Sequence, residues 1–149
     1  MVRLAEKRLQ IGIHQAVPRG QNSPGASGLF AFEPAGDAAH LLLVFRSTCP
    51  TCEQALPAWN RLARSSRWRT TAIGLETAGA AAAYASERIP AARVAVPRDP
   101  DRFTRRFRIS VVPTTLVIDR GGRLVARHAG PLEEADLEAL RLEADSSAP

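Results

Sequence analysis

The sequence has only two cysteines and three histidines, and its longest strongly apolar run is Leu41–Phe45. A run of that length is far short of the ~20 residues that a transmembrane helix needs. The N-terminus also lacks the charged region, apolar stretch and small-residue cleavage site of a secretory signal. Two cysteines and three scattered histidines (His14, His40 and His128) make a poor match to the four ligands of a structural zinc site. We therefore expect a soluble chain without a metal.

Lysine and aromatic residues are also scarce. Lys7 is the only lysine among 20 basic residues, and the aromatic residues are five Phe, two Trp and one Tyr. With 15 acidic residues the net charge is +5, and the pI is about 10.5. A solvated helix face is the simpler interpretation of each basic cluster, because neither accompanies a nucleic-acid-binding motif. The two clusters are Arg61, Arg64, Arg67 and Arg69, and Arg102, Arg105, Arg106 and Arg108. We expect no specific nucleic-acid partner.

The length and composition fit one globular domain. The chain has 149 residues, of which 45% are hydrophobic and 23% are charged. Residues 18–28 are rich in proline, glycine and serine, which is typical of a linker. We therefore predict an N-terminal extension over residues 1–28, a domain over residues 29–145 and a tail over residues 146–149.

Strand and helix patterns alternate along most of the chain. Strands are predicted at residues 29–32, 41–45, 70–75, 93–96, 114–118 and 124–128. Helices are predicted at residues 49–64, 78–88 and 100–107, and over a C-terminal stretch with Leu132, Leu137, Leu140 and Leu142. The run at residues 41–45 is apolar throughout, as expected for a strand buried on both faces. This alternation predicts an α/β domain with a central sheet between helices.

The two cysteines lie where a predicted strand becomes a helix, in the motif Cys49-Pro50-Thr51-Cys52. Unpaired backbone N–H groups and the positive end of the helix dipole stabilise a thiolate at such a position. The thiolate is the nucleophilic form of cysteine, so we predict that Cys49 is the exposed attacking thiol. Cys52 lies one helical turn further and is predicted to be the buried resolving thiol, which attacks a mixed disulfide formed on Cys49.

Three other interpretations of the pair are weaker. A structural disulfide across two residues closes a very short loop and gains little entropy. A zinc site lacks ligands, as noted above. Two inert buried thiols would have this spacing only by coincidence, whereas a CxxC motif between strand and helix is typical of redox proteins.

A second motif, Val112-Pro113-Thr114, places a proline directly before an apolar strand. We predict a cis peptide before Pro113, packed against the cysteine loop, which would leave the backbone of Val112 free to pair with an extended substrate. An ordinary trans proline that opens a strand is the alternative.

Together these residues resemble the thioredoxin-fold family over roughly two-thirds of the chain, from about residue 41 to the C-terminal helix. The resemblance also rests on Pro57 within the helix and on the predicted turn at residues 119–122. Within the family, the inserted segment at residues 70–96 is similar to the TlpA/ResA branch of exported oxidoreductases. The cysteine region and residues 10–14 are similar to the MauD-type accessory thioredoxins of methylamine utilisation.

The sequence departs from the family pattern near the cysteines. Leu43 stands where thioredoxin has a buried aspartate, and Ala55 stands where the ResA-like branch has a glutamate. Thr48 replaces a tryptophan, and Arg46 replaces a small residue. A solvent-facing Arg46 is the simpler expectation, although its charge would favour a Cys49 thiolate. We predict that the redox pair is kept without its usual proton acceptor.

The resemblance implies a thiol–disulfide oxidoreductase with Cys49 and Cys52 as catalytic residues and Pro50 and Thr51 in the motif loop. Val112, Pro113 and Thr114 would bind substrate. Its partners would be protein thiols or disulfides and a redox partner protein, with no cofactor or metal. The resemblance also implies a periplasmic or extracytoplasmic location and is compatible with a membrane anchor outside this chain. A cytoplasmic protein that starts at Met1 is the alternative.

Two other functions fit the same residues. One is a binding or chaperone module whose cysteines only tune partner docking, which the missing acids favour. The other is a peroxiredoxin-like peroxidase, which is disfavoured because residues 42–48 lack the proline that normally precedes a peroxidatic cysteine.

Overall fold

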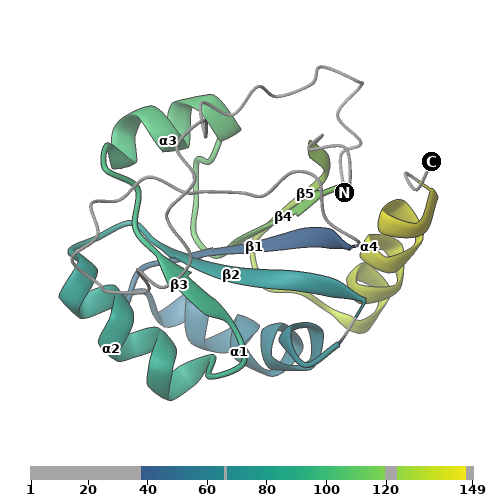
Figure 1. Ribbon diagram of the computed structural model, residues 1–149, viewed down its shortest axis with the longest axis horizontal. Coiled ribbons are helices and arrows are strands. Elements are labelled where there is room, and N and C mark those ends of the chain that lie inside the picture. The colour runs from purple at the N-terminus through teal and green to yellow at the C-terminus, as the bar shows by residue number, and fades with distance from the viewer. Residues whose placement is uncertain (1–37, 66, 120–123, 147–149) are drawn as a thin grey trace.

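The computed structural model describes residues 38–65, 67–119 and 124–146. Within these residues, five strands form one mixed sheet in the order β3-β2-β1-β4-β5 (Figure 1). They are β1 (Ala39–Phe45), β2 (Trp68–Gly74), β3 (Arg93–Ala95), β4 (Thr114–Ile118) and β5 (Leu124–Ala129). β1 pairs in parallel with β2, and β2 with β3, whereas β4 runs antiparallel to both β1 and β5. The predicted α/β class is confirmed.

Helices cover both faces of the sheet (Figure 1). They are α1 (Pro50–Ala63), α2 (Ala78–Arg88), α3 (Pro100–Phe107) and α4 (Glu134–Ser146). Leu41, Leu43 and Phe45 of β1 join the core beneath α1, α2 and α4, while Leu42 and Val44 join the core beneath α3. All five side chains are fully buried. The continuous apolar run therefore does mark a strand buried on both faces.

Close packing of α2 on the sheet depends on a glycine. A Cβ atom on Gly74, the last residue of β2, would lie 2.4 Å from the Cβ of Ala81 in α2. No real side chain tolerates that separation, so the helix reaches the strand only because both residues are small. This contact brings α2 close to the end of β1, where Phe45 stacks against Tyr84 of α2 with ring centroids 5.0 Å apart.

Some sequence predictions need correction. β1 begins at Ala39, two residues before its predicted start. β2 begins at Trp68, two residues before the predicted start, because this indole is buried and donates a hydrogen bond of 2.7 Å to Leu62 O. Leu132 is buried as expected but precedes α4 instead of lying within it. Arg69 lies in β2, so the first basic cluster is not a single helix face.

Several other predictions lie outside the described residues. These are the extension at residues 1–28 with its linker, the strand at residues 29–32, the turn residues 120–122 and residues 147–149 of the predicted tail. Ser146, the predicted first residue of that tail, is instead the last residue of α4. Among the described residues, no helix is both long and apolar enough to cross a membrane. The same part of the chain contains no group of three histidine, cysteine or acidic side chains that could hold a metal ion.

Candidate active site

Cys49 lies in the loop between β1 and α1, as the sequence predicts. It is the N-cap residue of α1, with an extended backbone (φ −97°, ψ 108°), and Pro50 occupies the first turn. Its Sγ accepts a hydrogen bond of 3.2 Å from Cys52 N–H, and its own N–H donates to Arg46 O at 3.2 Å. The side chain is half-buried, less open than predicted. A thiolate here receives a helix N–H group and the positive end of the dipole.

Cys52 lies one turn further along α1 and is fully buried. Both cysteines are free thiols in this structure. Burial is the largest cause that raises the pKa of the Cys52 thiol. With the contributions of Cys49 and Glu53, which also raise it, and of a hydrogen bond with the Arg46 backbone, which lowers it, the pKa is about 12. The buried thiol is thus kept protonated. The prediction that Cys52 is the buried member of the pair is confirmed.

The proline segment lies directly against Cys49. The Val112–Pro113 peptide bond is cis, as predicted, and the Cys49 thiol donates to Val112 O at 3.6 Å. Pro113 is buried, and its carbonyl accepts a hydrogen bond of 2.7 Å from Gly130 N–H at the end of β5. The Val112 carbonyl is therefore occupied in the reduced protein.

Val111 and Thr114 flank the Val112–Pro113 peptide bond in the sequence. The Thr114 hydroxyl donates to Val111 O at 2.7 Å, which closes a tight turn around Pro113. Thr114 is buried at the start of β4, whereas Val111 is 49% exposed. Val111 is one of three large apolar side chains that are exposed in the described part of the chain, the others being Val94 and Leu142. An apolar side chain is thus presented to solvent one residue before Val112, whose carbonyl contacts the Cys49 thiol.

No carboxylate lies at the positions where the family pattern has one. Leu43 and Ala55 are both fully buried in the same core as Cys52. The polar group that the sequence reasoning missed is Thr115, which pairs with Leu43 across β1 and β4. Its hydroxyl accepts a hydrogen bond of 2.9 Å from Trp59 Nε1.

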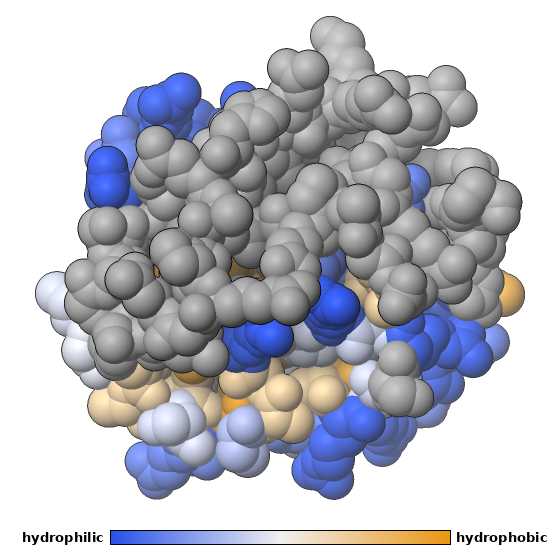
Figure 2. Space-filling view, in the orientation of Figure 1, coloured by the Kyte–Doolittle hydropathy of each residue, from blue (hydrophilic) through white to orange (hydrophobic). Residues whose placement is uncertain are grey.

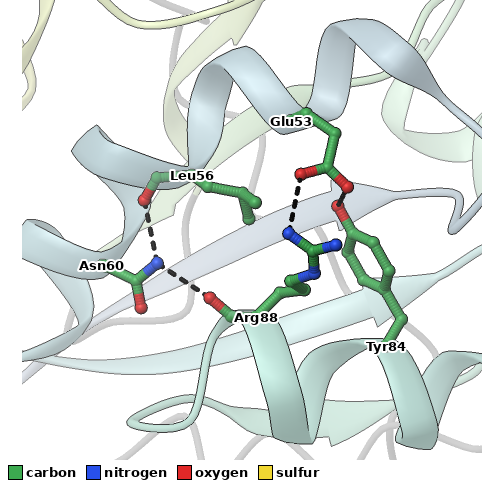
Figure 3. A network of polar contacts seen from close by, with 5 residues as sticks. All are labelled: Glu53, Leu56, Asn60, Tyr84 and Arg88. Atoms are coloured by element: carbon green, nitrogen blue, oxygen red, sulfur yellow. Dashed lines mark hydrogen bonds and ion pairs between the residues drawn. The ribbon is translucent and has the colours of Figure 1, made fainter.

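Glu53 follows Cys52 but points toward α2 (Figure 3). Tyr84 donates to one of its carboxylate oxygens and Arg88 to the other, both at 3.2 Å. Burial raises the pKa of Tyr84, and the Glu53 charge raises it further, so the phenol stays a donor. Asn60 extends the network by donating to Leu56 O and Arg88 O at 3.0 and 2.8 Å. Glu53 is thereby held between α1 and α2 beside the buried thiol.

A second carboxylate fixes the loop before Cys49. Glu76, just beyond β2, accepts hydrogen bonds from the Ser47 N–H at 2.9 and 3.0 Å and from the Ser47 hydroxyl at 2.6 Å. Arg46 is exposed as expected, and its guanidinium also donates to Leu75 O at 2.9 Å. These contacts extend the β1–β2 pairing beyond the strands and limit the freedom of the residues that lead to Cys49. No motif in the sequence pointed to Glu76.

Comparison with known proteins agrees with the architecture. No family model and no curated protein sequence matches the chain. Among solved structures, a thio-disulfide isomerase from Thermus thermophilus is 27% identical, with a TM-score of 0.62 over 74% of this chain and 82% of that one. A thiol-disulfide isomerase from Corynebacterium glutamicum is 20% identical, with a TM-score of 0.65 over 78% and 86%.

An uncharacterised thioredoxin-like protein from Porphyromonas gingivalis is 18% identical, with a TM-score of 0.59 over 75% of this chain and 79% of that one. At 18% and 20% sequence identity, the Porphyromonas and Corynebacterium proteins support the fold alone. The expected fold is confirmed, and the neighbours support a redox role for the cysteine pair at the level of the fold. The chain has a thioredoxin-like fold, with Cys49 and Cys52 at the junction of β1 and α1.

Proposed function

We propose that this protein is a thiol–disulfide oxidoreductase that exchanges disulfides with protein substrates through Cys49 and Cys52. One observation carries the proposal. Cys49 is partly accessible at a helix N-terminus and lies against the Val112 carbonyl, whereas Cys52 is buried one turn further on. This asymmetry suits an attacking thiol and a resolving thiol.

In the reducing direction, the Cys49 thiolate attacks one sulfur of a substrate disulfide. The Cys49–substrate bond forms, the substrate S–S bond breaks, and the other sulfur leaves as a thiolate that takes a proton from water. The Cys52 thiolate then attacks the Cys49 sulfur and expels the second substrate sulfur. Two electrons have passed to the substrate, and the protein retains a Cys49–Cys52 disulfide. An external dithiol protein must reduce that disulfide, and no cofactor or metal takes part.

The segment Val112-Pro113-Thr114 would hold the substrate chain during exchange. Once Cys49 is a thiolate or part of a mixed disulfide, it no longer donates to Val112 O, and that carbonyl is free to accept a substrate N–H. Pro50 and Thr51 are exposed beside Cys49 and would meet the substrate from the side of α1. The reacting disulfide would thus lie between the cysteine loop and the segment at residues 112–114.

We also infer an extracytoplasmic location and a place in the TlpA/ResA-like branch with similarity to MauD-type proteins. The support for this finer assignment is the resemblance around the cysteines and in the segment that forms β2, α2 and β3. Fractionation of cells that express the protein tests the location. Recovery of the protein in the cytoplasmic fraction alone would contradict it.

Reduction of insulin disulfides by the protein, with dithiothreitol as electron donor, tests the function. We expect turnover by the native protein, none by Cys49→Ser, and a mixed disulfide on Cys49 that accumulates in Cys52→Ser and is visible by mass spectrometry. Unchanged turnover in Cys49→Ser would overturn the proposal.

A binding module is the second candidate, and the absence of an acid at Leu43 and Ala55 favours it. Retention of full partner capture by the Cys49→Ser, Cys52→Ser double variant, together with no turnover by the native protein, would support this alternative. Peroxide consumption without any disulfide exchange would point instead to a peroxidase.

A further inference from the structure

We propose that the exposed arginines of α3 form a docking surface for protein partners that carry acidic residues beside their reactive cysteine. The surface, called here the α3 arginine face, consists of Arg102, Arg105, Arg106 and Arg108. This inference names a partner class for the proposed function and rests on it.

The packing of α3 turns these arginines outward. Phe103 and Phe107, four residues apart, are buried against the sheet with ring centroids 4.6 Å from each other. Residues at positions i, i+3 and i+4 share one helix face, so Arg102, Arg105 and Arg106 gather on the side away from the sheet. All four arginines of the face are exposed. Figure 2 shows hydrophilic side chains over α3, at the upper left.

These charges are only partly offset within the described part of the chain, because the four arginines outnumber the two carboxylates of the helix, Asp99 at its N-cap and Asp101 in its first turn. No side chain of the α3 arginine face forms an ion pair or hydrogen bond with another described residue. Arg61 and Arg88 of the other helices, in contrast, pair with Glu134 and Glu53 at 2.6 and 3.2 Å. Arg127 adds a further positive charge beneath the end of α3 by donating to Phe107 O at 3.4 Å. The local field is therefore positive.

The face lies next to the candidate active site. Arg108 has a left-handed backbone (φ 53°) that ends α3 and directs the chain toward Val112, only four residues further on. Four residues span at most ~14 Å, and Val112 O lies 3.6 Å from Cys49 Sγ. A protein interface covers roughly 800 Å² on each partner. A partner whose disulfide reaches Cys49 therefore also covers part of this face.

The apolar residues near the α3 arginine face fit a protein partner better than a lipid surface. The aromatic residues of α3 are buried and unavailable for insertion into a bilayer, while the exposed Val111 offers a single apolar contact at the edge of the face. An apolar contact beside the reacting thiol, bordered by cations, suits a polypeptide with acidic residues near its disulfide.

Three synthetic peptides test this, each with one cysteine blocked as a 2-pyridyl disulfide and flanked by glutamate, glutamine or lysine. The Cys49 thiolate attacks the peptide sulfur, and thiopyridone leaves with a proton, which gives an optical signal. We expect the native protein to react roughly tenfold faster with the acidic peptide than with the basic one at low salt, and the ratio to fall toward one in about 1 M salt.

The variant Arg105→Gln/Arg106→Gln should lose most of this preference, and Arg105→Glu/Arg106→Glu should reverse it. Arg64→Gln/Arg93→Gln is the matched control because it removes the same charge at exposed sites: Arg64 is at the far end of α1, roughly 20 Å from Cys49, and Arg93 begins the edge strand β3. An equal loss of preference in the control, or none in the α3 variants, overturns the proposal.

Two further measurements separate the possible failures. The uncharged 2,2′-dithiodipyridine should react equally fast with the native protein and the α3 variants, and failure of the native protein to react with it would contradict the proposed function itself. Binding to vesicles of anionic phospholipid that is lost in the α3 variants, with unchanged peptide preference, would make the face a lipid contact and overturn the proposal.

Discussion

The two cysteines lie one helical turn apart, yet their surroundings differ sharply. Cys49 lies at the end of a helix, partly open, with a backbone N–H group directed at its sulfur. Cys52 is enclosed by an apolar core that includes Leu43 and Ala55, and its pKa is raised to about 12. The first environment leaves the sulfur accessible to a partner, and the second keeps the thiol protonated. In the proposed mechanism, this difference separates attack from resolution and makes resolution the difficult step.

This contrast also explains how a chain without the usual acid can keep the motif. Attack by Cys49 needs only a thiolate at a helix end, which the backbone itself stabilises. Resolution by Cys52 needs a proton acceptor inside the core. The apolar side chains of Leu43 and Ala55 cannot accept a proton. We expect the protein to form mixed disulfides readily and to release them slowly.

The largest expected effect is on labelling of the reduced protein by iodoacetamide. A thiol with a pKa of about 12 has a thiolate fraction of about 10⁻⁴ at pH 8. Label should therefore appear on Cys49 long before Cys52, and labelling of Cys52 in the Cys49→Ser variant should keep rising well above pH 9. Peptide mapping measures both. Comparable labelling of the two thiols at pH 8 would remove the contrast.

The same pKa sets the pH dependence of resolution. In a mixed disulfide Cys49 carries no thiol, so its contribution to the raised pKa of Cys52 is lost, while burial, the largest cause, remains. The rate of resolution should thus climb through pH 8 and beyond as Cys52 ionises, because the group is protonated below its pKa. A plateau reached by neutral pH would mean that an acid from elsewhere assists.

The next effect in size is that of an acid placed in the core. Ala55→Glu should speed resolution at neutral pH by roughly tenfold or more and flatten the climb with pH, because general-base assistance typically contributes about 10²–10⁴-fold. Ala55 is fully buried, so the new carboxyl group will also lower stability. Ala55→Gln, similar in size but not a base, is the control. Equal acceleration by both variants would point to a packing effect.

A smaller effect is expected on the side of Cys49, where Glu76 fixes Ser47. Glu76→Ala removes three hydrogen bonds to a carboxylate and should lower the free energy of unfolding by about 2 kcal/mol. It should also slow alkylation of Cys49 a few-fold, since the loop loses its support. Glu134→Ala, which breaks an exposed pair with Arg61, should cost less than about 1 kcal/mol. Urea unfolding compares the two.

Loss of loop support and loss of negative charge in Glu76→Ala should change the rate of Cys49 alkylation in opposite directions. Removal of a nearby negative charge alone would favour the thiolate and speed alkylation of Cys49. Faster labelling of Glu76→Ala would therefore contradict a positioning role for this residue.

The local features of this molecule were predictable because they depend on neighbours in sequence. The bounds of α2 and α3 agree with prediction, and the burial of Cys52 follows from its place one turn inside α1. The contacts of Glu53 and Glu76 were not predictable, since they join residues 29 to 35 positions apart. Periodicity shows which face of a helix is polar, but not which element lies opposite that face.

The smallest expected effect concerns Glu53, and its sign decides what this residue does. Glu53 directly follows Cys52 in the sequence and would be able to accept the proton of Cys52 if its side chain turned inward. In the structure both of its carboxylate oxygens are bound, one by Tyr84 and the other by Arg88, and its charge raises the pKa of Cys52. Glu53→Gln should therefore lower the pKa of Cys52 slightly and speed resolution about two- to threefold. A rapid-mixing experiment measures the rate of resolution directly. Arg88→Gln, which leaves the Glu53 carboxylate in place without its cation, should slow resolution. If Glu53→Gln instead slows resolution, then Glu53 serves as the base after all, and the buried thiol is less isolated from solvent-exposed acids than its surroundings indicate.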